Sequence, residues 1–163
     1  MAKIEMPDDY YAQTPDANIR ATEAVMNTIK TADLLFDRIG RLLRPLNVSA
    51  AGGLVLGLLR DRGPMSPSEL GERLIVTRAT VTGLLDSLER RGFVHRSRNA
   101  TDRRSLTVEI TAEGRVVLQA LRQLIHGQEQ AWLSAFSEVE LGTYIETLHR
   151  IQDVVAAATD GLD

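Results

Sequence analysis

The strongest constraint on the fold of this chain is a set of helix start and stop signals between residues 66 and 92. Ser66 suits the N-cap of a helix, Pro67 suits its first position, and Glu69 completes a capping box. Thr77 suits the cap of a second helix, which Gly92 would end. The apolar residues of this second helix recur at helical spacing and form one buried stripe: Val81, Leu84, Leu85 and Leu88. The segment therefore predicts a short helix, a tight turn and a longer helix.

Two short strands are expected directly after this pair of helices. Residues 93–96 and 106–110 read as strands, and the polar turn between them closes a hairpin. A short extra strand before the helix that starts at Pro67 is left open.

Helical spacing predicts the remaining elements. Further helices are expected over residues 18–44, 50–62, 112–134 and from 138 onward, with start signals at Ser49, at Thr111 and in the Ser137–Glu140 capping box. Pro45 is expected to stop the first of them. Residues 1 to about 18 form either an ordered arm or a loose tail. The expected order is α-α-α-α-β-β-α-α, which makes the fold mainly α.

Composition excludes several classes of protein. The chain has 163 residues, is 44% hydrophobic and 25% charged, and can therefore form a core of its own. It has no Cys, which excludes disulfides and thiolate metal sites, and its scattered histidines (His95, His126 and His149) predict no metal site. No secretory signal and no apolar run long enough to cross a bilayer are visible, so a cytoplasmic protein without membrane contact is expected. Nucleophile-elbow, zinc-protease, phosphate-loop and dinucleotide motifs are missing, so we expect no enzyme.

Positive charge gathers in the middle of the chain. Residues 60–104 hold ten Arg and six acidic residues, a local balance of +4, although the net charge of the chain is −3. A GC-rich genome would explain a high total of Arg but not this clustering. The planar guanidinium fork suits phosphates and guanine edges, so the middle of the chain is predicted to bind nucleic acid.

The helix that Thr77 starts is the candidate for reading DNA sequence. In a helix-turn-helix the second helix enters the major groove, where each base pair shows a distinct pattern of donors and acceptors. Arg78 would bind a guanine edge, the threonines would contact phosphates or bases, and Ala79 and Gly83 would let the backbone approach. The predicted contact set is Thr77, Arg78, Ala79, Thr80, Thr82, Gly83 and Arg90. Taken alone, this pattern is shared by any two adjacent amphipathic helices.

The hairpin adds a second candidate DNA contact. Its basic residues and one acid are Arg96, Arg98, Asp102, Arg103 and Arg104. A thin loop of this kind can lie along the minor groove, where Arg is favoured by the negative potential. Two interpretations of Asp102 stay open: it initiates the turn, or its carboxylate holds an Arg in one orientation. Arg103 either touches a phosphate or faces solvent.

From Gly63 to Gly114 the sequence resembles the winged helix of the MarR family of bacterial transcriptional regulators. The most specific element is DRRSLTVEITAEG, in which Ile110 replaces the usual Leu. The resemblance implies that Asp102 pairs with Arg104, that Arg104 enters the minor groove, and that residues 78–91 form the recognition helix. Gly83 departs from the pattern, because relatives often have a long polar or basic residue there.

The resemblance also implies a homodimer that binds double-stranded DNA. We expect a dimerisation helix in residues 1–47, a winged helix-turn-helix DNA-binding domain in residues 48–111, and dimerisation helices in residues 112–163. The apolar stripe of the last helix would pack either on a second copy or within the chain: Leu141, Ile145, Leu148, Ile151 and Val155. The expected function is that of a sequence-specific transcriptional regulator, a repressor on a palindromic operator.

A small-molecule effector is the last implication of the resemblance. Members of this family often respond to small aromatic or phenolic acids, and no cofactor is expected. Candidate lining residues are Phe36, Arg41, His126 and Trp132. The alternative function is a winged-helix module that binds another protein and not DNA, which would need an apolar exposed face on its second helix.

Overall fold

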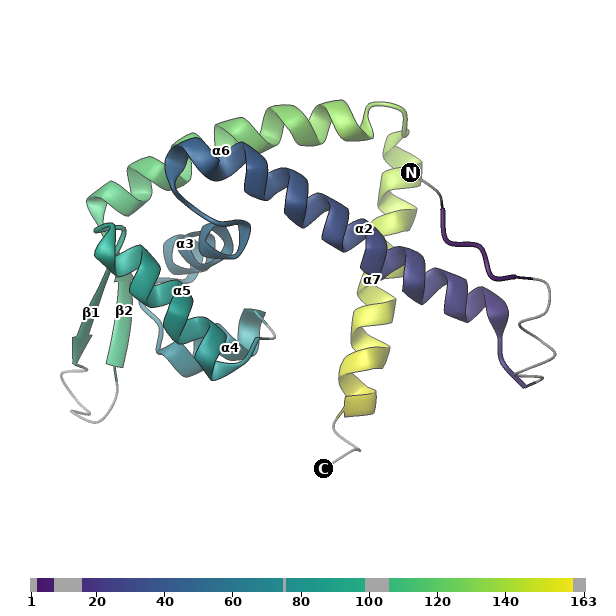
Figure 1. Cartoon of the computed structure of the whole chain (residues 1–163), viewed down its shortest axis with the longest axis horizontal. Coiled ribbons are helices and arrows are strands. Elements are labelled where there is room, and N and C mark those ends of the chain that lie inside the picture. Colours follow the sequence, from purple (N-terminus) through teal and green to yellow (C-terminus); the bar gives the residue numbers. More distant parts are fainter. Residues whose placement is uncertain (1–2, 8–15, 75, 99–105, 160–163) are drawn as a thin grey trace. The chain divides into compact units, whose positions relative to one another are not determined.

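The computed structural model describes residues 3–7, 16–74, 76–98 and 106–159. Its elements, in chain order, are α2 (Ile19–Leu43), the 3-10 helix η1 (Arg44–Leu46), α3 (Ala50–Arg62), α4 (Pro67–Leu74), α5 (Arg78–Arg90), β1 (Val94–Arg98), β2 (Leu106–Ile110), α6 (Ala112–Leu133) and α7 (Glu138–Thr159) (Figure 1). The predicted element order and the mainly α class are confirmed. Asp102, Arg103 and Arg104 lie outside the described residues.

The predicted helix caps are present as hydrogen bonds. In the α4 capping box, the Ser66 backbone N–H donates to Glu69 Oε2 over 2.7 Å, and the Glu69 N–H donates to Ser66 Oγ over 3.2 Å. Ser49 and Thr77 accept from backbone N–H groups at the starts of α3 and α5. Ser137 and Glu140 form a second reciprocal box at α7. Since each cap joins residues only three positions apart, the local sequence is sufficient to specify it.

Replacing Ser66 with Ala is expected to lower the free energy of unfolding by about 1 kcal/mol, because α4 then has an unpaired N–H at its start. Urea denaturation followed by circular dichroism measures this. The Ser66 backbone and hydroxyl bonds lower the pKa of the Glu69 carboxyl. Stabilisation from this carboxylate is therefore complete above the pKa of an unfolded Glu and disappears as pH falls through the lowered value. An unchanged denaturation midpoint for Ser66→Ala would contradict the capping role.

Two boundaries differ from the sequence prediction. Helix α2 ends at Leu43, before Pro45, as predicted, but residues 44–46 continue as the 3-10 helix η1, which tolerates Pro in its first turn. The 3-10 helix η1 ends at Asn47, whose φ of 53° lies in the left-handed region. Strand β1 starts at Val94, not at Phe93, because the Phe93 N–H donates to Leu88 O and so belongs to the end of α5. Gly92, with a φ of 73°, makes that left-handed ending possible, as predicted.

The two strands form an antiparallel sheet in the order β1-β2, with Arg96 opposite Val108. Where the sequence left a short extra strand open, the described residues form an isolated bridge between Met65 and Val108, which is a single residue pair and not a third strand. The core packs between this sheet and helices α3, α4 and α5. Its most deeply buried side chains are Leu43, Val55, Leu56, Leu59, Leu70, Val81, Leu85 and Val108. Leu84, predicted to be buried, is only half-buried.

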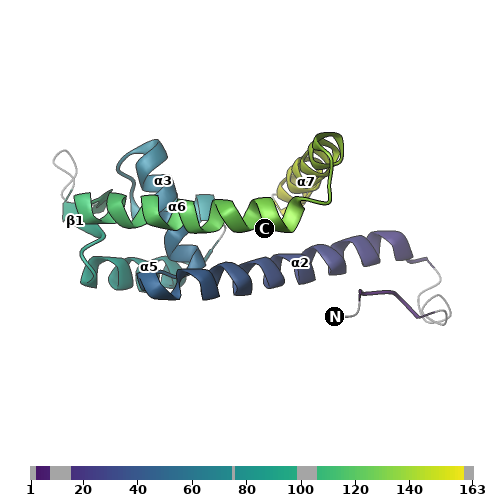
Figure 2. The same cartoon turned by 90° about the horizontal axis from the view of Figure 1, so that it is seen from above.

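Helix α6 starts against the end of α5 (Figure 2). Thr111 donates its N–H to Phe93 O over 3.1 Å and its hydroxyl to Gly92 O over 2.6 Å. The same hydroxyl accepts from the Gly114 N–H over 3.0 Å. Gly114 is buried, and a Cβ there would lie 2.1 Å from Phe93 O and 2.9 Å from Ile110 Cγ1. Only glycine therefore permits this contact between the first turn of α6 and the start of the hairpin.

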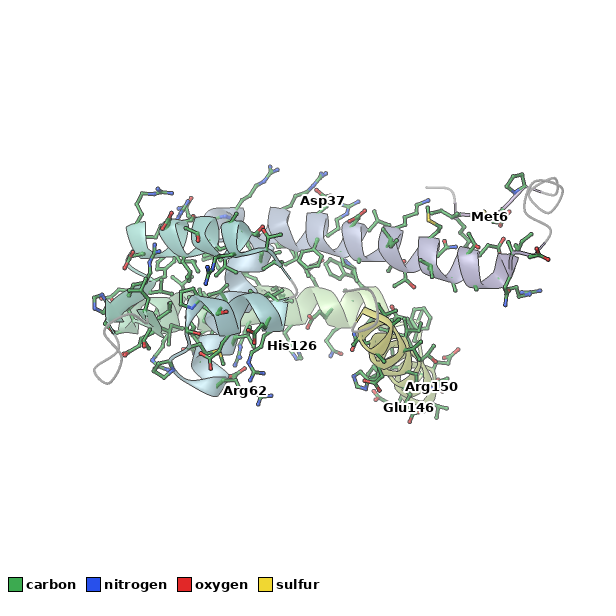
Figure 3. All side chains as sticks on the ribbon, turned by 90° about the horizontal axis from the view of Figure 1, so that it is seen from below. Met6, Asp37, Arg62, His126, Glu146 and Arg150 are labelled. Atoms are coloured by element: carbon green, nitrogen blue, oxygen red, sulfur yellow. The ribbon has the colours of Figure 1, made fainter. Side chains whose placement is uncertain are left out.

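The start of the chain docks on α2. Asn27 of α2 accepts from the Ile4 N–H over 3.2 Å and donates to Ile4 O over 2.9 Å. Glu23 accepts from the Met6 N–H over 3.0 Å, which places residues 3–7 along the helix (Figure 3). Of the two expectations for this region, an ordered arm is confirmed for residues 3–7, the part that these bonds involve.

The chain divides into two compact units, residues 1–125 and 126–163. The first holds the helix-turn-helix, the hairpin and the N-terminal helix; the second holds the end of α6 and all of α7. The division into three functional segments at residues 47 and 111 remains a prediction. Within the described residues, no single helix is long and apolar enough to cross a bilayer, and one bent pair, Ile19–Leu46 with Ala50–Arg62, meets only the length and composition criteria.

Candidate nucleic-acid interface

Helices α4 and α5 form the two-helix unit that the sequence predicted. The Val76 N–H donates to Gly71 O, and the Val81 N–H donates to Thr77 O, so the connection is tight at both ends. A Cβ on Gly71 would meet Val76 O and Val81 Cγ2 at 3.4 Å, which shows how closely the turn approaches α4. Leu70 of α4 and three side chains of α5, those of Val81, Leu85 and Leu88, are buried. The opposite side of α5 is therefore turned outward.

The outward face of α5 is the predicted contact surface. Its predicted DNA contacts are all exposed: Thr77, Arg78, Ala79, Thr80, Thr82, Gly83 and Arg90. Arg78 and Arg90 form no salt bridge with any carboxylate of the described residues. Within the described residues, both guanidinium groups therefore have donors that a ligand could use.

The threonine hydroxyls of α5 have bonds within the helix. Thr77 Oγ1 accepts from the Thr80 N–H over 3.3 Å and lies 2.9 Å from Thr80 Oγ1. The Thr82 hydroxyl donates to Arg78 O over 3.0 Å. Thr77 therefore caps the helix, and a DNA contact by its hydroxyl remains a prediction. Thr82 has its proton engaged, which leaves its oxygen and its methyl group for an outside partner.

Gly83 lies in the middle of the outward face of α5. A Cβ on Gly83 would meet no atom within 4 Å, so packing inside the chain does not require glycine here. A helix-interior glycine nevertheless costs about 1 kcal/mol relative to Ala. Packing within the folded chain therefore does not explain the glycine. Its reason must lie either outside the folded chain or in the evolutionary history of the sequence.

Replacing Gly83 with Ala is expected to raise the free energy of unfolding by up to about 1 kcal/mol. If the backbone of α5 approaches DNA closely at this point, the added methyl group also weakens DNA binding. Thermal unfolding and a gel shift on the same preparation measure the two effects. A more stable variant that binds DNA as tightly as the parent would contradict the close approach.

Arg96 forms a contact that the sequence did not reveal. Its Nε donates to Glu89 Oε2 over 2.8 Å, its Nη2 pairs with Asp86, and its backbone N–H donates to Glu89 Oε1 over 3.1 Å. The Asp86 hydrogen bond is the main reason that the pKa of the Arg96 guanidinium is raised. The side chain is only 18% exposed. A direct DNA contact by Arg96 remains a prediction, but its donors already face α5.

The hairpin alternates between buried and exposed side chains. Val94, Val108 and Ile110 are buried against the core, whereas His95 and Glu109 are exposed and face each other across the strands. At the far end of the described hairpin, Arg98 pairs with Leu106. The predicted minor-groove residues follow in the segment that the structure does not describe.

The predicted effector residues fall into both compact units. Phe36 is 50% exposed on α2, and Arg41 pairs with Asp37 one turn before it over 3.0 Å. His126 is exposed and Trp132 is half-buried, both in the unit of residues 126–163. A shared site for these residues stays a prediction. Among the described residues, no cluster of His, Asp or Glu is arranged to hold a metal ion.

A capped helix-turn-helix followed directly by a two-stranded hairpin defines a winged helix-turn-helix protein. Comparison with known proteins specifies the family. The MarR family model matches residues 48–106. The HTH-type transcriptional regulator PecS of Dickeya dadantii is 31% identical over 132 residues, which cover 78% of this chain and 79% of PecS. The chain belongs to the MarR family.

Solved structures agree with this assignment. The transcriptional regulator BldR of Sulfolobus solfataricus superposes with a TM-score of 0.75 at 31% identity, over 84% of this chain and 98% of BldR. A variant of MarR from E. coli in complex with operator DNA gives a TM-score of 0.72 at 23% identity, over 89% and 99% of the two chains, which supports the fold. PecS and BldR, both 31% identical to this chain, are transcriptional regulators, the class of protein that the sequence predicted.

Proposed function

We propose that this protein regulates transcription by binding double-stranded DNA, with α5 in the major groove and the hairpin in the neighbouring minor groove. The observation that carries the proposal is the outward face of α5, where Arg78 and Arg90 are exposed and unpaired with described carboxylates. From such positions on a helix in the major groove, the guanidinium group of Arg binds guanine edges and phosphates. A variant of MarR from E. coli with the same fold forms a complex with operator DNA, which supports DNA as the ligand.

The described surface also favours DNA over a protein as the ligand of α5. A module that binds another protein through this helix would need large apolar side chains on the outward face. The exposed residues there are instead small, hydroxylated or cationic, apart from one acid, Asp86, which pairs with Arg96. The positive balance of +4 over residues 60–104 points the same way.

The protein would act as a homodimer on a palindromic operator. In the unit of residues 126–163, the predicted apolar stripe of α7 exposes Ile145 by 50% and Ile151 by 39%. Exposed apolar faces of this extent mark association sites. In a two-fold dimer the two α5 helices would read half-sites about one helical turn apart. Size-exclusion chromatography with light scattering should give twice the chain mass of 18.0 kDa.

The proposed outcome of DNA binding is repression that a small aromatic acid relieves. A dimer bound across a promoter would exclude RNA polymerase, and an effector would weaken that binding through its higher affinity for the DNA-free state. Phe36, Arg41, His126 and Trp132 are the proposed lining residues. A thermal-shift screen of aromatic carboxylic acids, followed by gel shift with each hit, tests this step.

Selection of duplexes from a random library by the purified protein tests DNA binding itself. We expect enrichment of one palindromic motif and a binding constant that falls steeply with salt. A library that remains unenriched, together with salt-insensitive binding to a protein partner, would replace the proposal with the protein-binding alternative.

A further inference from the structure

An ion-pair cluster joins strand β1 of the hairpin to helix α5. Arg96 lies in the middle of β1, opposite Val108 of β2. Its guanidinium spans two carboxylates of α5, those of Asp86 and Glu89, which lie one helical turn apart. The cluster therefore connects the two elements that would enter adjacent grooves of DNA.

The cluster fixes the backbone of β1 as well as the Arg96 side chain. One Glu89 carboxylate accepts from both the backbone N–H of Arg96, over 3.1 Å, and its Nε, over 2.8 Å. Charge-assisted bonds of this kind hold both orientation and position. Since the side chain is only 18% exposed, water competes for these bonds less than at an open surface pair.

The cluster also changes the charge of the face of α5 that is turned outward. Asp86 is exposed and lies on the same side of α5 as Gly83 and Arg90, at positions three and four residues away. An unpaired carboxylate at that place would repel the phosphates of an approaching duplex. Arg96 neutralises it from the side of the hairpin.

We propose that Arg96 is a positioning residue for DNA binding: it fixes the hairpin against the recognition helix and neutralises Asp86 on the face that meets DNA. This inference rests on the proposed function. It assigns Arg96 an action through α5 and not through a contact of its own with phosphate or base.

Two variants with opposite changes of charge test the proposal. Arg96→Gln removes one positive charge, whereas the double variant D86N/E89Q removes two negative charges and leaves Arg96 in place. The probe is one duplex that the parent protein has selected from random DNA. Hydroxyl-radical cleavage reports the minor groove, and methylation of guanine N7 by dimethyl sulfate reports the major groove.

With either variant, the minor groove beside each half-site is expected to lose its protection from hydroxyl-radical cleavage. The guanines within the half-site should stay protected from methylation. Arg96→Gln should also bind about tenfold more weakly at fixed salt, with the salt dependence of the parent. If Arg96 contacted a phosphate itself, the result would differ, because loss of that contact would make the binding constant depend less steeply on salt concentration. Full protection of the minor groove by D86N/E89Q, or by Arg96→Gln, would overturn the proposal.

Matched controls separate this result from misfolding and from failure of the proposed function. Arg122→Gln makes the same change of charge and breaks an exposed pair, with Asp61 at 3.0 Å, in which no residue of α5 or of the hairpin takes part; it should keep the parental footprint. Circular dichroism and thermal unfolding check each variant. If Arg96→Gln does not fold, D86N/E89Q carries the same test. A parent protein that selects no duplex refutes the proposed function before the variants are compared.

Discussion

Replacing Gly114 with Ala is expected to destabilise the fold by at least about 3 kcal/mol. The new Cβ would lie 2.1 Å from the carbonyl oxygen of Phe93, a backbone atom that cannot rotate away. Helix α6 would have to move, which would stretch both the Thr111–Phe93 and Thr111–Gly92 hydrogen bonds. Urea denaturation followed by circular dichroism measures the loss.

A graded series of glycines provides the control for this prediction. A Cβ on Gly57, in α3, would meet nothing within 4 Å, so Gly57→Ala should be neutral or stabilising. On Gly53 it would meet Leu121 Cδ1 at 2.8 Å, a side-chain end that can adjust, so the effect should be intermediate. Equal denaturation midpoints for the parent and Gly114→Ala would show that α6 does not pack on Phe93 as the structure describes.

These glycines differ in whether a local pattern of residues or a contact between distant segments determines their role. Helix caps at Ser66 and Thr77 were predictable because a cap involves a side chain and an N–H three residues away. The close approach at Gly114 depends on where a hairpin returns the chain, and the sequence around Gly114 carries no sign of it. The prediction that Gly92 ends α5 succeeded because a left-handed ending is also a local property.

The interface shows the same division between local and distant contacts. The outward face of α5 followed from the period of its buried residues, which the structure reproduces for Val81, Leu85 and Leu88. The pairing of Arg96 with α5 did not follow, because it needs strand β1 to fold back beside the helix. Acidic residues one turn apart on a helix, with an Arg in the next strand, are the signal that would have suggested it.

The hairpin residue with the largest predicted effect on DNA binding is Arg104. Arg104→Ala should weaken binding to the selected duplex by about tenfold to a hundredfold, because an Arg in a narrow minor groove makes strong electrostatic contacts. The prediction rests on the sequence, since Arg104 lies outside the described residues. Gel shift over a range of salt concentrations measures both the affinity and the number of phosphate contacts.

Asp102→Asn distinguishes the two interpretations of the neighbouring acid. If the Asp102 carboxylate orients Arg104, the Asn variant should lose part of the same binding energy, although it removes a negative charge that would otherwise oppose DNA. If Asp102 only initiates the turn, Asn serves equally well and binding should hold or improve.

The control for Arg104→Ala is Arg38→Ala, which makes the same change of charge at an exposed position of α2. This variant should bind DNA like the parent. Unchanged affinity of Arg104→Ala at fixed moderate salt would refute the minor-groove assignment, and binding would then depend on α5 and its two exposed arginines.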